Sequence, residues 1–97
     1  MDGALNFLNE LESVMDQRCQ DGPHDSYVYR SMTGHLDRLL KKIGEEAGEV
    51  IIAAKNNDPH ELVNESADLL FHLMMVLKKQ GVSIHDVVNI LIQRNGS

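Results

Sequence analysis

Two pairs of carboxylates near the middle of the chain have a spacing that suits metal binding. Glu46 and Glu49 form one pair, Glu65 and Asp68 form the other, and the members of each pair are three positions apart along the chain. On an α-helix this spacing places both side chains on one face, about one turn apart. Clustered carboxylates repel one another unless a cation neutralises them. Hard oxygen ligands without a thiolate cluster favour Mg²⁺ or Mn²⁺, which commonly bridge to substrate phosphates.

The segment between the two pairs predicts a tight turn between helices. Asp58 is suited to cap a helix, Pro59 to occupy its first position, and Glu61 to complete a capping box. A helix therefore ends near Asn57 and another begins directly after it. Two helices joined so closely pack antiparallel as a hairpin.

The hairpin would bring the two acid pairs level with each other. Glu49 and Glu65 are each eight residues from Asn57, and Glu46 and Asp68 are each eleven residues from it. Both pairs also fall on one edge of an apolar stripe of their helix. Four carboxylates can then converge beside the core. The alternative for each single acid is that it belongs to the solvated face of a surface helix.

Composition predicts a single all-α domain spanning residues 1–97. A chain of this length buries about 60 to 70% of its unfolded surface. Its hydrophobic content is 42%, with four aromatic residues, no Trp and two Pro, which suits helices packed through Leu, Ile, Val and Met. Apolar surface left over would suit a partner helix, so we expect a homodimer.

Charge and cysteine content exclude several classes of protein. A formal net charge of −6 argues against nonspecific binding to a nucleic-acid backbone, which needs clustered Lys and Arg. Cys19 is the single cysteine, which fits a reducing compartment. The sequence has neither an apolar run near 18 residues nor a signal-peptide pattern. We therefore expect a cytoplasmic protein that does not enter a membrane.

Periodicity and caps predict four long helices in an up-down arrangement. The first would start from a cap at Asp2, reach about Cys19 and carry solvated acids, namely Glu10, Glu12 and Asp16. Residues 24–30 would form a loop or a short turn of helix. The next helices would cover about 35–56, 59–80 and 84–94, with Gly81 ending the third and Ser83 capping the fourth.

Several residues beside the acid pairs allow two interpretations. Lys42 precedes Glu46 by four residues, so it could form an ordinary helical salt bridge or neutralise phosphate oxygens. Gly44 and Gly48 each cost a helix about 1 kcal/mol relative to Ala, which suggests close approach of another helix or of a ligand. His72 could orient the Asp68 carboxylate, reach a ligand, or be a satisfied buried histidine.

Three segments together resemble a known enzyme family. They are KKIGEEAGEV, NESADLLFHLMMVL and GVSIHDVV, at residues 41–50, 64–77 and 81–88. The chain resembles the phosphoribosyl-ATP pyrophosphohydrolases of histidine biosynthesis, within the wider all-α MazG-like superfamily with its ExxE, variable gap and ExxD pattern. The quartet alone indicates the superfamily, and Ser26-Tyr27, the Lys41-Lys42 pair and the run from Asn64 to His72 indicate the narrower family.

The resemblance implies hydrolysis of phosphoribosyl-ATP to phosphoribosyl-AMP and diphosphate by a Mg²⁺-dependent helical homodimer, with Mn²⁺ as the alternative metal. It implies that the metal is held by Glu46, Glu49, Glu65 and Asp68. Glu45 would support the site or help to activate water, so the implied catalytic residues are Glu45, Glu46 and Glu49. The implied substrate-binding residues are Lys41, Lys42, Ser26, Asn64 and His72.

The sequence departs from the family at Val28, where a Thr is common, which leaves the role of residues 28–35 open. Nothing in the 97 residues resembles a phosphoribosyl-AMP cyclohydrolase, so we expect another protein to carry the next step.

One alternative function is a MazG-like house-cleaning pyrophosphatase acting on noncanonical nucleoside triphosphates. Another is a noncatalytic helical dimerisation module. A ferritin-like di-iron bundle is disfavoured, because it requires Glu-x-x-His motifs, in which the acid and the histidine are three positions apart. In this chain Asp68 and His72 are four positions apart, and no second such pair exists.

Overall fold

The computed structural model describes residues 3–96, and every regular element in this range is a helix. The elements are α1 (Gly3–Asp21), α2 (Tyr27–Thr33), α3 (Leu36–Lys55), α4 (Pro59–Lys79) and α5 (Ile84–Asn95). The predicted all-α class is confirmed. The four long helices are those expected from the sequence, and the expected loop or short turn at residues 24–30 forms α2. The predicted cap Asp2 lies outside the described residues.

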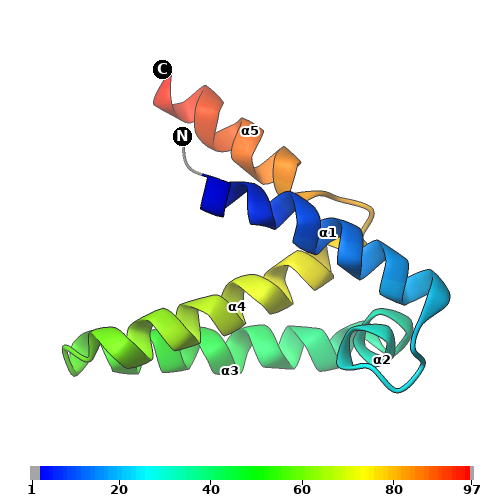
Figure 1. Ribbon diagram of the computed structural model, residues 1–97. Coiled ribbons are helices and arrows are strands. Elements are labelled where there is room, and N and C mark those ends of the chain that lie inside the picture. The colour runs from blue at the N-terminus through cyan, green and yellow to red at the C-terminus, as the bar shows by residue number, and fades with distance from the viewer. Residues whose placement is uncertain (1–2, 97) are drawn as a thin grey trace.

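Helices α3 and α4 form the predicted antiparallel hairpin (Figure 1). Asn57 has a left-handed φ of 54°, and its N–H donates to the Ala54 carbonyl at 3.1 Å, while the Asp58 N–H donates to the Ala53 carbonyl at 3.1 Å. This pair of bonds is a Schellman motif, which ends α3. The Asp58 side chain then accepts from the Glu61 N–H at 3.1 Å and caps α4. Asp58 therefore ends one helix and starts the next.

The other predicted helix caps are also present. Gly81 has a φ of 75°, and the Val82 N–H reaches the Leu77 carbonyl at 2.9 Å to end α4. Ser83 and Asp86 form a capping box at the start of α5. These bonds satisfy backbone groups that a helix leaves without partners at its ends.

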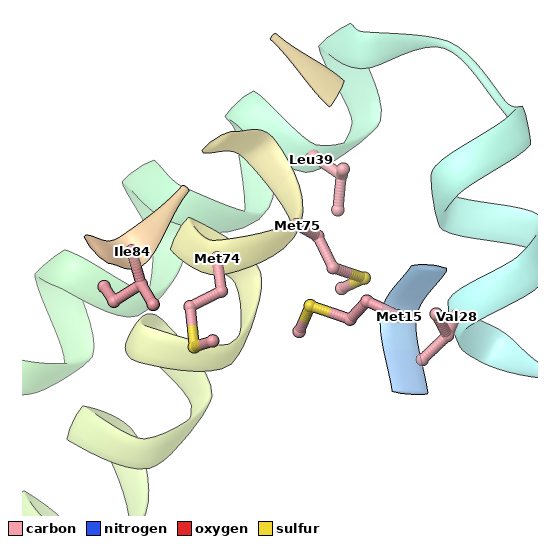
Figure 2. Packing of buried hydrophobic residues seen from close by; sticks show 6 residues of the cluster. All are labelled: Met15, Val28, Leu39, Met74, Met75 and Ile84. Carbon is pink, nitrogen blue, oxygen red and sulfur yellow. The ribbon is translucent and has the colours of Figure 1, made fainter. Parts of the chain in front are cut away.

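The core lies where α1 and α2 meet the open end of the hairpin. Figure 2 shows Met15 from α1 and Met75 from α4 pointing toward one another, with Leu39 and Val28 beside them. Met74 is buried next to Ile84 of α5. The flexible methionine side chains fill the irregular space between helices that cross at different angles.

The acidic residue Glu12 of α1 joins the two ends of the chain. Its side chain is 8% exposed, and its carboxylate accepts from the Ile84 N–H at 2.7 Å and from the Ser83 hydroxyl at 3.2 Å. The prediction that Glu12 is solvated is wrong, because a carboxylate at a helix N-terminus satisfies unpaired N–H groups and the positive end of the helix dipole. Asp16 is exposed as expected and pairs with Lys78 at 3.0 Å.

The chain is more open than a typical domain of its length. Its radius of gyration is 14.7 Å, whereas a compact domain of this size has about 12.5 Å. Figure 1 shows α1 and α5 diverging at an angle from the α3–α4 hairpin. None of the described helices is both long and apolar enough to span a bilayer.

Candidate active site

The two acid pairs occupy the α3–α4 hairpin with very different exposure. Glu46 is only 9% exposed, Glu65 is half-buried, and Glu49 and Asp68 are exposed. Partial burial, followed by the charges of Glu49 and Asp68 and of two further acids, raises the pKa of Glu65 above its ordinary value of 4.5. The hairpin thus brings the two pairs within electrostatic reach of each other.

The carboxylates do not form a closed metal cage. Among residues 3–96, no group of three His, Cys, Asp or Glu side chains is arranged tightly enough to hold one ion. Glu49 and Glu65 do line a shared cavity of about 140 Å³, which Asp58 and Glu61 line as well. Rotation about side-chain bonds would be needed to bring more than two of these acids onto one cation.

The buried His72 of α4 lies in close contact with the Glu46 carboxylate of α3. His72 Nδ1 lies 2.6 Å from Glu46 Oε1 and 2.8 Å from the Asp68 backbone carbonyl. His72 Nε2 lies 2.6 Å from the Tyr27 hydroxyl. His72 therefore contacts the Glu46 carboxylate of the other helix, and reaches Asp68 through its carbonyl only.

The four carboxylates have the ligand chemistry that a hard cation requires. The four carboxylates offer only oxygen ligands, which Mg²⁺ and Mn²⁺ prefer. Glu46 Oε1 is buried and has no hydrogen-bond partner among the described residues. Its 2.6 Å approach to His72 is an ion-pair contact without hydrogen-bond alignment, since the ring nitrogen also faces the Asp68 carbonyl. A buried carboxylate oxygen left in this way has lone pairs available for a metal.

Basic residues lie beside the acids, toward the start of α3. Lys41, Lys42, Glu45 and Arg38 line an open depression of about 370 Å³. Lys42 and Arg38 also line a smaller cavity of about 70 Å³ with Tyr27 and three polar residues of the α2–α3 region, namely Arg30, Ser31 and His35. Figure 1 shows α2 packed at this end of α3.

The structure adds two residues that the sequence interpretation did not name. Arg38 and His35 face the same cavity as Lys42 and Tyr27. The signal for Arg38 was present, because it precedes Lys42 by four residues and Glu46 by eight, which places all three on one helical face. The alternative of a Lys42–Glu46 salt bridge is not formed in the described part of the chain.

The remaining predicted contacts are placed as follows. Ser26 is half-buried, and its hydroxyl accepts from the Tyr29 N–H at 3.0 Å as the cap of α2. Asn64 is exposed on α4, with its side-chain nitrogen 3.3 Å from His60 Nε2. Both ring nitrogens of His72 are engaged inside the chain, so direct contact with a substrate would require their release.

Comparison with known proteins identifies the family of this chain. Residues 8–95 match the family model described as phosphoribosyl-ATP pyrophosphohydrolase. The chain belongs to the phosphoribosyl-ATP pyrophosphohydrolase family. Within this family, it is 44% identical over 91 residues to a phosphoribosyl-ATP pyrophosphatase of Leptospira biflexa, an alignment that covers 94% of this chain and 99% of the relative.

Some members of the phosphoribosyl-ATP pyrophosphohydrolase family are longer. The chain is 46% identical over 91 residues to the histidine biosynthesis bifunctional protein HisIE of Bacillus subtilis, covering 94% of this chain and 44% of that protein. It is 47% identical over 92 residues to the protein of the same name from Thermus thermophilus, covering 43% of it. The chain thus spans less than half the length of these bifunctional relatives.

Proposed function

We propose that the protein hydrolyses phosphoribosyl-ATP to phosphoribosyl-AMP and diphosphate, the second step of histidine biosynthesis, with Mg²⁺ as its cofactor. The observation that carries the proposal is the pairing of an acidic hairpin face with an adjoining basic cavity, in a chain of this family. One set of residues suits a cation, and the other suits phosphate oxygens. The expected cytoplasmic location is part of the same proposal.

We assign the metal to Glu46, Glu49, Glu65 and Asp68. When bound there, Mg²⁺ would supply positive charge to the phosphate oxygens and to the diphosphate leaving group. The raised pKa of Glu65 supports the assignment, because burial and then the neighbouring carboxylates disfavour its ionised form, and a cation would offset both. The buried oxygen of Glu46 supports it as well.

The basic residues would hold the phosphates that the metal does not reach. Lys41, Lys42 and Arg38 share the open depression with Glu45, so their charges can neutralise phosphate oxygens beside that carboxylate. Glu45 is exposed and is therefore accessible to the attacking water, which it would orient or deprotonate. Ser26 and Asn64 would bind more peripheral parts of the substrate.

We further propose a homodimer that uses the outer face of α3. Leu40 and Ile51 are 46% and 63% exposed, and they share one side of the helix with Gly44 and Gly48, opposite the buried Leu39. A Cβ atom built on either glycine would meet nothing within 4 Å. No other described helix of the chain therefore packs closely against these two glycines, contrary to one of the two alternatives predicted for them. In a dimer, α3 of a second copy would pack there.

The deciding experiment measures diphosphate release from phosphoribosyl-ATP with Mg²⁺ and with chelator. Ordinary and damaged nucleoside triphosphates serve as competing substrates, and Glu49→Gln serves as the inactive control. We expect Mg²⁺-dependent turnover of phosphoribosyl-ATP and a loss of at least about 100-fold in the variant, in line with the removal of an electrostatic catalytic group. Turnover of the other triphosphates alone would assign the protein to the house-cleaning pyrophosphatases, and no turnover by folded protein would contradict both enzyme proposals.

A further inference from the structure

Three polar side chains link the basic cavity to the acidic face. Tyr27 lines the cavity, and its hydroxyl lies 2.6 Å from His72 Nε2. His72, which is 6% exposed, lies 2.6 Å from Glu46 through its other nitrogen, Nδ1. The three residues come from α2, α4 and α3, so their contacts exist only in the folded chain.

The partners of the imidazole ring decide where its hydrogen lies. Nδ1 lies close to a carboxylate oxygen of Glu46 and to the backbone carbonyl oxygen of Asp68, and a carbonyl and an ionised carboxylate only accept. The 2.8 Å contact with the Asp68 carbonyl is a hydrogen bond and requires a hydrogen on Nδ1. The Glu46 oxygen lies 2.6 Å from the same nitrogen as a close electrostatic contact without a hydrogen bond. The Tyr27 hydroxyl can donate to Nε2 at 2.6 Å, which is compatible with the same tautomer.

Aromatic packing fixes the ring in this position. The Tyr27 and His72 rings are edge-on at 5.6 Å between centroids, and Phe71 packs edge-on against His72 at 5.4 Å. Tyr27 also stacks against Phe71 at 6.3 Å. A histidine confined in this way cannot turn its Nδ1 from Glu46 without breaking several contacts.

We propose that His72 and Tyr27 are positioning residues for the reaction. His72 orients the Glu46 carboxylate toward the other acids, and Tyr27 holds the imidazole ring and its tautomer. This inference rests on the proposed function, since it takes Glu46 as a metal ligand. It changes the role expected for His72 from a substrate contact to a residue that acts through Glu46. Partners of this kind typically contribute 10- to 100-fold to metal affinity.

Two substitutions of His72 by amide residues distinguish the role of Nδ1 from the role of Nε2. In His72→Asn the amide nitrogen occupies roughly the position of Nδ1, so it can still donate toward Glu46 but cannot reach Tyr27. In His72→Gln the amide lies near the position of Nε2, so it keeps the Tyr27 contact and leaves Glu46 unsupported. Both variants remove the same ring, which makes each the control for the other.

The measurement is the dissociation constant of Mn²⁺ and of Mg²⁺ by titration calorimetry, without substrate. We expect His72→Gln to weaken metal binding about 10- to 100-fold and His72→Asn to keep it within about threefold of the parent protein. Equal metal affinity in the two variants, whether both weakened or both unchanged, would overturn the proposal. Thermal unfolding of both variants checks that they fold to the same extent.

Nitrogen-15 NMR of the unsubstituted protein without metal shows directly which ring nitrogen of His72 carries the hydrogen. We expect the His72 signals, assigned by their absence in His72→Asn, to show hydrogen on Nδ1 and a hydrogen-bonded Nε2. Tyr27→Phe should shift Nε2, whereas Tyr29→Phe in the same short helix should not. Hydrogen on Nε2 alone, or no response to Tyr27→Phe, would contradict the proposal even if kinetics were normal.

These readouts distinguish the two levels of inference. If the protein failed to turn over phosphoribosyl-ATP but showed the expected metal affinities and ring signals, the proposed function would fail, and only the support of Glu46 as a metal ligand by His72 would stand. If turnover were normal and His72→Gln bound metal as tightly as the parent, the positioning role would fail alone. In an active enzyme we expect His72→Gln to lower kcat more than it raises KM at saturating metal, because Glu46 acts on the phosphates in the transition state.

Discussion

Glu65 is an acid of the two pairs whose pKa is raised above its ordinary value. Its pKa is raised by partial burial and by the carboxylates of Glu49 and Asp68, among others. A carboxyl group with a raised folded-state pKa stabilises the fold fully below its ordinary value of 4.5 and loses that contribution as pH rises through the raised value. At neutral pH, ionised Glu65 therefore destabilises the protein when no cation is bound.

We predict that Glu65→Gln is more thermally stable than the parent protein in chelator at pH 7. The difference should shrink as pH falls toward 4, where Glu65 is protonated in both folded and unfolded states. Circular dichroism melts across this pH range measure it, and Glu10→Gln on α1 controls for the loss of one negative charge. Added Mg²⁺ should stabilise the parent more than the variant, because the ion binds the folded parent better. A variant that melts below the parent at pH 7 in chelator would contradict this account.

The four acids also show where sequence reasoning stops at the level of single residues. The spacing of Glu46 and Glu49 predicts that both share one helix face, but not that Glu46 is buried while Glu49 is exposed. That difference depends on His72, which is remote in sequence and approaches from α4. Glu12 was misjudged for the same reason, since its partners Ser83 and Ile84 are about seventy residues away.

At the level of elements, local signals predict the helices well. The caps at Asp58 and Ser83 and the ending at Gly81 are all present, because each requires only residues that are neighbours in the chain. The extent of α2 was less evident from the sequence. Val28, within that segment, gains its burial from contacts with α1 and the hairpin, which no local pattern encodes.

The double role of Asp58 gives a prediction about the hairpin. Its N–H ends α3 and its side chain caps α4, so the register of the two acid pairs depends on this turn. Asp58→Ala should cost about 1 kcal/mol of folding free energy, which lowers the Tm of a domain of this size by about 4–8 °C. Urea and thermal unfolding measure the loss.

Asp58→Asn is the matched control, because asparagine caps a helix about as well as aspartate. It should unfold close to the parent protein while removing a charge from the cavity that Glu49 and Glu65 line. Comparable destabilisation by both substitutions would show that charge, and not the cap, is the important property of Asp58. No destabilisation by Asp58→Ala would mean that the Schellman motif alone fixes the turn.

At the level of the whole molecule, the single chain exposes more surface than a folded protein of its mass usually does. Its accessible surface is 6736 Å², whereas a 10.9 kDa monomer typically exposes about 5,600 Å². Part of the excess lies on α3, where Leu40 and Ile51 flank the two open glycines. An exposed apolar face of this kind on an open chain favours association.

We predict that Ile51→Glu converts a homodimer into a monomer. The substitution places a charge on the outer face of α3, which a dimer would bury at a cost of several kcal/mol, whereas the isolated chain exposes this side chain to water. Light scattering coupled to size exclusion should give twice the 10.9 kDa chain mass for the parent and the chain mass for the variant. Ile51→Val, which keeps the face apolar, should remain dimeric. If Ile51→Glu stayed dimeric and Leu5→Glu on α1 became monomeric, the interface would lie on the exposed apolar residues of α1 instead, and the outer face of α3 would need another explanation for its glycines.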